Sequence, residues 1–269
     1  MEPFDVIYET DGLPSQELPP QLGRLYGGDL GFKSPRQYAN FVSSLDGVVA
    51  IEAVDQSSQM ISGNSRPDRF VMGLLRAFAD AVLIGAATMR AAPDSLWTPG
   101  YIFPDCATDF SGLRDRLARD AQPRLVVLTS SGALDPRHPA LEAGALVVTT
   151  EAGSAKLGTR LPPSSKVVAI GDAEDVDLPS VMSVLHGEGH EFVLTEGGPT
   201  VIGGLLRRRL LDELFLTVSP LLAGRSSTSG RPGLVEGIDL LPERKVSSEL
   251  VSARRHGSHL FLRYEISGS

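Results

Sequence analysis

The stretch FVLTEGGPTVIGGLL, residues 192–206, joins two apolar segments through a glutamate, two glycines and a proline. The first segment, 191–195, is short and continuously apolar, as expected of a parallel strand buried on both faces. Residues 200–213 have the apolar spacing of a helix. A glycine turn between such a strand and helix leaves N–H groups free at the helix N-terminus, where the helix dipole favours an anion.

This turn is not one of the familiar nucleotide motifs. Gly198 and Gly203 have the spacing of a P-loop, but Gly204 and Leu205 stand where lysine and serine or threonine are required. The G-x-G-x-x-G fingerprint of a Rossmann fold is absent from the stretch too. With both motifs excluded, the turn is interpreted as an anion cradle that has no lysine and would hold a dinucleotide pyrophosphate through backbone amides. The alternative is a tight turn that serves close packing alone.

The same alternation of apolar strands and helices extends on both sides of this stretch. We predict strands at 37–44, 81–85, 123–132, 144–150, 166–171, 191–195 and 214–222, and helices at 67–80, 86–92 and 200–213. Two further strands flank Gly257 as a terminal hairpin. The prediction is a single α/β domain over 36–269, with a mixed, mostly parallel central sheet flanked by helices and an antiparallel C-terminal hairpin. Residues 1–35, rich in proline and glycine, are predicted to form an irregular N-terminal arm.

Composition narrows the range of partners. The 269 residues are 42% hydrophobic and 22% charged, as in soluble globular proteins, and the net charge of −8 disfavours nucleic acid or an anionic membrane surface. The single cysteine, Cys106, excludes an intrachain disulfide and is typical of a reducing compartment. The N-terminus lacks a signal peptide, and no apolar run approaches the length of a membrane span. We therefore expect a cytoplasmic protein.

Other local patterns are weaker. Gly85 and Thr88 form a second strand-to-helix turn of small residues, and Ser44 with Asp46 suggests a turn that Asp46 caps. His186 and His190 lack the order of a zinc protease motif and lie among glycines, so we predict a loop and no metal site. No G-x-S-x-G elbow supports a hydrolase. The loop 223–233, with two arginines, is interpreted as a mobile connection rather than a phosphate contact.

Four segments in order, ANFVSSLDG, LLRAFADAVLIGAATMR, LTEGGPTVIGGLL and LLDELFLTVSPLLAG, resemble the reductase domain of riboflavin biosynthesis, in the dihydrofolate-reductase-like superfamily. The resemblance runs from about residue 37 to the C-terminus and is greatest to stand-alone actinobacterial members. It implies a dihydrofolate-reductase-like fold, a homodimer and NADPH as cofactor. It also implies hydride transfer to C1′ of an opened ribosylamino-pyrimidine phosphate.

The resemblance carries over to single residues. Glu196 would orient the heterocycle or deliver a proton, with Asp46 as second choice, although Glu196 could also simply cap the following helix. The implied cofactor-binding residues are Val42, Ser44, Gly85, Thr88, Ser130, Gly197, Gly198, Pro199, Thr200 and Val201. The implied substrate-binding residues are Ser58, Met60, Arg76, Leu96 and Glu196. Ser131 is implied to assist with the cofactor 2′-phosphate, with no arginine beside it in the sequence.

At two positions the sequence differs from the family pattern, so the identity of the substrate is not decided. Ala92 stands where the family has an aspartate, and Pro99 where an arginine would bind the substrate phosphate. The zinc deaminase motifs of bifunctional relatives are missing, so only the reductase half is expected. Reduction of dihydrofolate or another pterin, and NADP binding without catalysis, therefore stay as alternatives.

Overall fold

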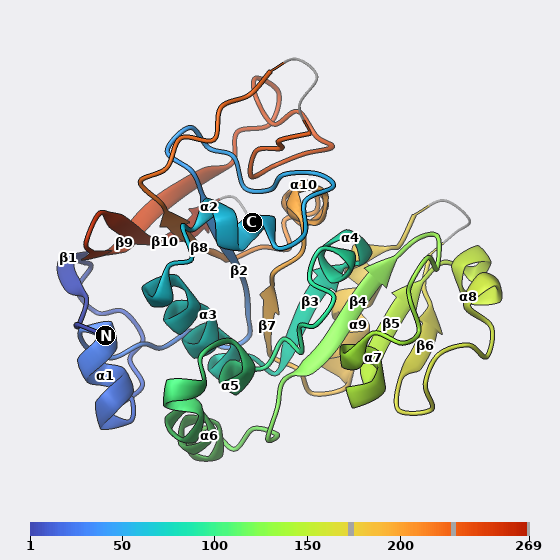
Figure 1. The fold of residues 1–269 in the computed structure, drawn as a ribbon, viewed down its shortest axis with the longest axis horizontal. Coiled ribbons are helices and arrows are strands. Elements are labelled where there is room, and N and C mark those ends of the chain that lie inside the picture. The colour runs from blue at the N-terminus through green and yellow to red at the C-terminus, as the bar shows by residue number, and fades with distance from the viewer. Residues whose placement is uncertain (172–174, 227–229, 268–269) are drawn as a thin grey trace.

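A ten-stranded mixed sheet runs through the whole molecule (Figure 1). The computed structural model describes residues 1–171, 175–226 and 230–267. The strand order is β1-β9-β10-β8-β2-β7-β3-β4-β5-β6, parallel from β8 to β6 and antiparallel among β1, β9, β10 and β8. The predicted fold class, with its C-terminal hairpin, is confirmed. The strands are β1 (Asp5–Glu9), β2 (Arg36–Ser43), β3 (Ala81–Gly85), β4 (Arg124–Thr129), β5 (Ala145–Thr149), β6 (Lys166–Ala169), β7 (Phe192–Thr195), β8 (Glu213–Val218), β9 (Ser247–His256) and β10 (His259–Ser267).

Helices cover both faces of the parallel part of the sheet, because successive strand residues point to opposite faces. Val82 and Ile84 of β3 join the core cluster that holds α3 and α6, whereas Leu83 joins the cluster that holds α9 and α10. The helices are α1 (Pro20–Tyr26), α2 (Ser57–Ile61), α3 (Arg66–Phe78), α4 (Ala86–Arg90), α5 (Pro99–Ile102), α6 (Ala107–Arg116), α7 (Pro139–Ala143), α8 (Glu151–Leu157), α9 (Leu178–Gly187) and α10 (Pro199–Arg207). Within the described residues, none of these helices has the length and apolar character that crossing a membrane requires.

The helix α3 follows the sequence prediction closely. The side chain of Ser65 caps its start by accepting a hydrogen bond from the N–H of Asp68, and Pro67 occupies its first turn. The predicted helix at 200–213, in contrast, ends at Arg207 as α10. Arg209 takes a left-handed backbone conformation, with φ of 55°, so the chain turns there towards β8. The apolar spacing continued past the turn because Leu211 is buried in the core as a loop residue.

The prediction of an irregular arm over residues 1–35 is wrong. β1 pairs with β9 at the edge of the sheet, and α1 buries Leu22, Leu25 and Tyr26 in the main core. Those three residues have the i, i+3, i+4 spacing of a helix face, but the surrounding prolines and glycines concealed so short a helix. The predicted domain start at residue 36 coincides with the first residue of β2.

The topology gathers one end of every parallel strand at one edge of the sheet. The carboxyl ends of β2, β7 and β3 are neighbours there, since β7 pairs with both other strands. In sheets of this type ligands bind outside the carboxyl ends of the strands. This edge is therefore where a site is expected.

Candidate active site

A cavity of about 1140 Å³ opens at the carboxyl ends of β2, β7 and β3. Its walls come from the segment after β2, from α2, α3 and α4, and from the start of α10. Eleven residues predicted for the site line this cavity: Val42, Ser58, Arg76, Gly85, Thr88, Glu196, Gly197, Gly198, Pro199, Thr200 and Val201. Residues far apart in the sequence thus form one site.

The turn between β7 and α10 has the form of the predicted anion cradle. A Cβ added to Gly197 would lie 2.9 Å from Cβ of Val201, so glycine is required there. A Cβ on Gly198 would fit without a clash, since its nearest neighbour would be Thr88 Oγ1 at 3.9 Å. None of the described residues accepts a hydrogen bond from the N–H of Gly198 or of Thr200. Two amides without a partner among the described residues therefore belong to the cavity wall, at the N-terminus of a nine-residue helix, where an anion binds well.

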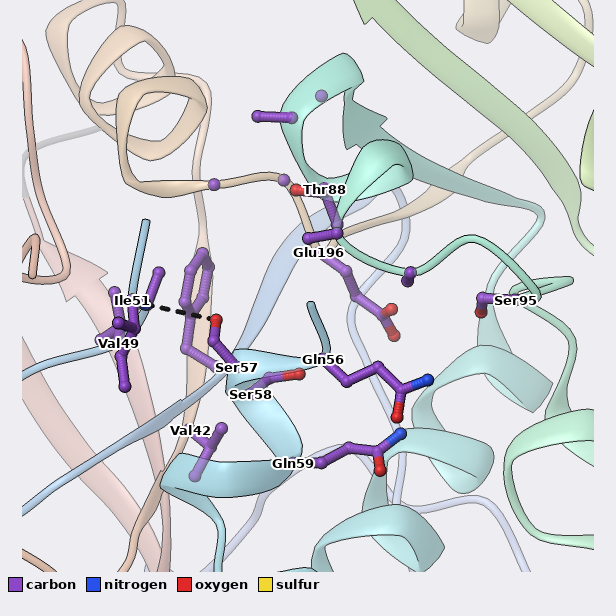
Figure 2. A pocket seen from close by; sticks show the side chains of 18 of the residues that line it. Val42, Val49, Ile51, Gln56, Ser57, Ser58, Gln59, Thr88, Ser95 and Glu196 are labelled. Carbon is purple, nitrogen blue, oxygen red and sulfur yellow. Dashed lines mark hydrogen bonds between the residues drawn. The ribbon is translucent and has the colours of Figure 1, made fainter. Parts of the chain in front are cut away.

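A second turn faces this cradle. Gly85 ends β3 and precedes α4, which carries Thr88. Thr88 and Glu196 lie on the same side of the cavity (Figure 2). The two turns bring small residues and free polar groups together, which allows the close approach of a pyrophosphate. The residues present suit a dinucleotide.

Below the cradle, Glu196 forms a buried ion pair with Arg76 of α3. Arg76 Nε donates to Glu196 Oε1 at 2.9 Å and Nη2 donates to Oε2 at 2.6 Å, while the two side chains are 2% and 7% exposed. This two-point geometry fixes the plane of the carboxylate. Each carboxylate oxygen keeps a second lone pair for a ligand N–H. The guanidinium of Arg76, by contrast, is committed to Glu196 and to the carbonyl of Thr98.

Sequence reasoning missed Asp68, a buried carboxyl in the cavity wall. Asp68 is 4% exposed in the first turn of α3. Burial raises its pKa from 3.8 to about 6, against the opposing hydrogen bond from Thr217 and the charge of His259. Asp68, Met72 and Arg76 recur at every fourth residue on the wall that α3 presents to the cavity. That spacing was the available signal, but the sequence suggested only a helix start.

Two glutamines were missed as well. Gln56 and Gln59 extend from α2 and its start towards the space that the Glu196 carboxylate enters (Figure 2). Their amides can donate and accept hydrogen bonds, as recognition of a heterocycle requires.

Asp46 and Ser44 lie outside the cavity lining. The predicted turn forms, because the N–H of Gly47 donates to the carbonyl of Ser44, and Ser44 Oγ donates to Asp46 Oδ1 at 2.6 Å; the backbone groups that Asp46 caps, however, lie in the loop after β8. The Asp46 carboxylate also accepts from the N–H groups of Ala223 and Gly224, at 3.0 and 2.7 Å. These hydrogen bonds, that of Ser44 first, lower the pKa of Asp46 to about 2. Asp46 therefore anchors the loop after β8 and has no proton to deliver at neutral pH.

Three other predicted residues also lie outside the lining. Met60 is 56% exposed, Leu96 is half-buried beside the cavity, and Ser130 is exposed just after β4. The histidine segment differs from its predicted loop, because His186 lies in α9, where its Nε2 is 2.9 Å from Gln37 Nε2. Within residues 1–171, 175–226 and 230–267, no three His, Cys, Asp or Glu side chains are grouped to hold a metal ion.

The fold and the relatives below define the class, an α/β oxidoreductase. The family model of the RibD C-terminal domain matches residues 37–261, and the chain belongs to this family. The resemblance found from the four sequence segments is thereby confirmed.

Named relatives agree with this membership. The chain is 25% identical over 221 residues to the 2,5-diamino-6-ribosylamino-4(3H)-pyrimidinone 5′-phosphate reductase of Archaeoglobus fulgidus, covering 79% of this chain and 91% of the relative. It is 27% identical over 237 residues to the enzyme of the same name from Methanothermobacter thermautotrophicus, covering 87% and 99%. The fold is similar to that of a pyrimidine reductase-like protein from Corynebacterium diphtheriae, with a TM-score of 0.61 and 22% identity over 87% of this chain and 93% of that one.

Proposed function

We propose that the protein is an NADPH-dependent reductase of riboflavin biosynthesis that acts on a ribosylamino-pyrimidine 5′-phosphate. The substrate is the diamino-pyrimidinone named in the relatives above or its amino-uracil analogue. The observation that carries the proposal is the cradle of Gly197 and Gly198, which faces the turn of Gly85 and Thr88 directly above the Glu196–Arg76 pair. One cavity thus offers a cradle for the pyrophosphate of the cofactor and a fixed carboxylate for the heterocycle of the substrate.

Bound NADPH supplies a hydride, which reduces C1′ of the opened ribosylamino group to the ribitylamino product. The N–H groups of Gly198 and Thr200 hold the pyrophosphate, and Val42, Gly85 and Thr88 shape the path of the dinucleotide. Glu196, fixed by Arg76, accepts hydrogen bonds from the ring N–H groups of the pyrimidine. Reduction of a carbon–nitrogen double bond also needs a proton at nitrogen.

We assign that proton to Asp68 rather than to Glu196 or Asp46. A carboxyl with a pKa of about 6 holds protons close to neutral pH, as an efficient general acid does. Both oxygens of Glu196 already accept hydrogen bonds from Arg76. Asp46 is tied to the loop after β8.

We also propose a homodimer that forms through the outer face of β8 and β10. Leu216 and Val218 of β8 pair across the strands with Leu262 and Leu260 of β10, and all four side chains are exposed or half-buried. This apolar sheet face suits a second copy. The buried, unpaired Cys106 supports the cytoplasmic location.

A pterin reductase is the second candidate, favoured by one observation. Pro99, which stands where the family arginine would bind phosphate, is buried at the start of α5. No cation can therefore replace that arginine at this position. Dihydrofolate, which has no ribose phosphate, would not need one.

One experiment separates these candidates. Purified protein is given NADPH with the ribosylamino-pyrimidine phosphate or with dihydrofolate, and loss of reduced nicotinamide absorbance is followed, with NADH as the control cofactor. Turnover of the pyrimidine supports the proposed function, and turnover of dihydrofolate alone transfers the assignment to the pterin. Tight NADPH binding without either turnover would leave a nucleotide-binding protein and overturn both.

A further inference from the structure

One end of the cavity carries an arginine that the reductase chemistry described above does not use. Arg90 is the last residue of α4, is exposed, and lines the cavity on the side of β4. None of the described carboxylates pairs with it.

The contacts of Arg90 place it beside the loop that follows β4. Arg90 Nη1 donates to the carbonyl oxygen of Ala133 at 3.3 Å. The N–H of the same residue, Ala133, donates to Ser131 Oγ at 3.3 Å. The guanidinium and the Ser131 hydroxyl are thus held by one residue, although the sequence offers no arginine next to Ser131. A guanidinium has five N–H donors, so most of those on Arg90 are free for a ligand.

The strand order sets a path from the cradle to this point. β7, β3 and β4 are neighbours in that order, so the turns at Gly198, at Gly85 and at Ser130 follow one another along the edge of the sheet. Neighbouring strands lie about 4.8 Å apart, and two such steps are about 10 Å. If the pyrophosphate of a dinucleotide binds in the cradle and its adenosine extends along this edge, the ribose of that adenosine reaches Arg90 and Ser131.

Three other arginines near the cavity or on this loop already have partners, and Arg69, which also lines the cavity, lies on α3 rather than on the turns at this edge. Arg76 is paired with Glu196, and Arg231 donates to the carbonyls of Ala223 and Gly224. Arg137 lies on the same loop as Ser131 but pairs with Asp135. Because the chain carries a net charge of −8, a phosphate at this edge depends on a local cation.

We propose that Arg90 and the Ser131 hydroxyl bind the 2′-phosphate of the cofactor, and that Arg90 thereby determines the preference for NADPH over NADH. This rests on the proposed function, because it takes the cradle as the pyrophosphate site. Arg90 is a specificity residue; it acts on the cofactor and makes no contact with the acceptor.

Binding without turnover tests this directly. Isothermal titration gives the Kd of the wild type, Arg90→Gln and Arg90→Lys for NADP⁺, NAD⁺, 2′,5′-ADP and 5′-ADP. The control is Arg137→Gln, which removes a positive charge from the loop that carries Ser131, where the Arg137 side chain is 86% exposed and paired with Asp135. We expect Arg90→Gln to weaken NADP⁺ and 2′,5′-ADP by about tenfold to a hundredfold, as for loss of charge-assisted hydrogen bonds, and to leave NAD⁺ and 5′-ADP unchanged.

The Arg90→Lys variant and the wild type give further outcomes that support or overturn the assignment. Arg90→Lys should retain part of the NADP⁺ preference, because it keeps the charge and loses the planar fork. Equal weakening of NADP⁺ and NAD⁺ by Arg90→Gln, or an equal effect of Arg137→Gln, would overturn the assignment in favour of a structural or long-range role. A wild type that binds both dinucleotides equally overturns this inference alone. A wild type that binds neither overturns the proposed function as well.

Discussion

Asp68 shows how a single residue can lower stability and supply chemistry. Its pKa is raised from 3.8 to about 6, so the folded protein holds a proton that the unfolded chain releases between these values. The stability associated with Asp68 is therefore greatest below about pH 4 and falls as pH rises towards 6. We expect Asp68→Asn to be more stable than the wild type at pH 8, by up to about 3 kcal/mol, with a smaller difference at pH 4. Urea unfolding at both pH values measures this.

The same substitution should remove the general acid. We expect kcat to fall by about a hundredfold or more, and the decline of wild-type activity above pH 6 to disappear from the profile. Asp46→Asn is the control, since the pKa of Asp46 is about 2 and its carboxylate stays ionised over the assay range. Full activity in Asp68→Asn would overturn this assignment and would indicate that Glu196 or a water molecule donates the proton.

Local patterns could reveal some of these residues and not others. The cradle at Gly197 and Gly198 was visible because a glycine turn between a strand and a helix is contiguous in the sequence. The burial of Asp68 depends on tertiary packing, and its hydrogen bond comes from Thr217 on β8. The approach of Arg90 to Ser131 likewise needs α4 and the loop after β4 to meet in space.

At the scale of one element, a substitution at the start of α10 should change cofactor binding without changing the stability of the fold. Gly198 has φ of −66° and ψ of 174°, which alanine adopts freely, and an added Cβ would meet only Thr88 Oγ1, at 3.9 Å, in the wall of the cavity. We expect Gly198→Ala to keep the melting temperature and to raise the Kd for NADP⁺ by about tenfold, because the methyl group occupies the place of the anion. Titration and thermal unfolding check the two halves. Gly112→Ala in α6, where a Cβ would meet no atom within 4 Å, should leave the Kd unchanged.

In the N-terminal segment we expect the opposite, a substitution with a large effect on the stability of the fold. Phe4 is 5% exposed, and its ring lies 4.6 Å from that of Phe261 in edge-to-face contact. We expect Phe4→Ala to lower the free energy of unfolding by about 3–5 kcal/mol, as for other buried phenylalanines. Ile7→Ala on the exposed β1 should change it by less than about 0.5 kcal/mol. Equal effects would show that this segment lies free of the core in solution.

Elements differed in how far the sequence revealed them. The apolar runs of β3, β4, β5 and β7 and the long amphipathic α3 were predicted correctly, because each carries a full period of its pattern. α5 and α7 have only four and five residues, too few to establish a helical period. The end of α10 was misplaced because Leu211 continued the apolar spacing into a loop.

At the scale of the whole molecule, the proposed dimer can be tested on one exposed side chain. Leu260 is 37% exposed on the outer face of β10. We expect Leu260→Arg to convert a dimer into a folded monomer, because an unpaired charge would be buried at the interface. Light scattering after size exclusion gives the mass. Leu241→Arg, in a loop where the side chain is 72% exposed, is the control and should stay dimeric.

The strand order also dictates the timing of biosynthesis. β3, β4, β5 and β6 pair with one another in the order in which they leave the ribosome, whereas β2 pairs only with β7 and β8, which begin at residues 192 and 213. At about 5–20 residues per second, β2 is made roughly seven to thirty seconds before its first neighbour, β7. The nascent chain therefore carries this central strand unpaired throughout that interval, which makes β2 the segment for a ribosome-associated chaperone to protect.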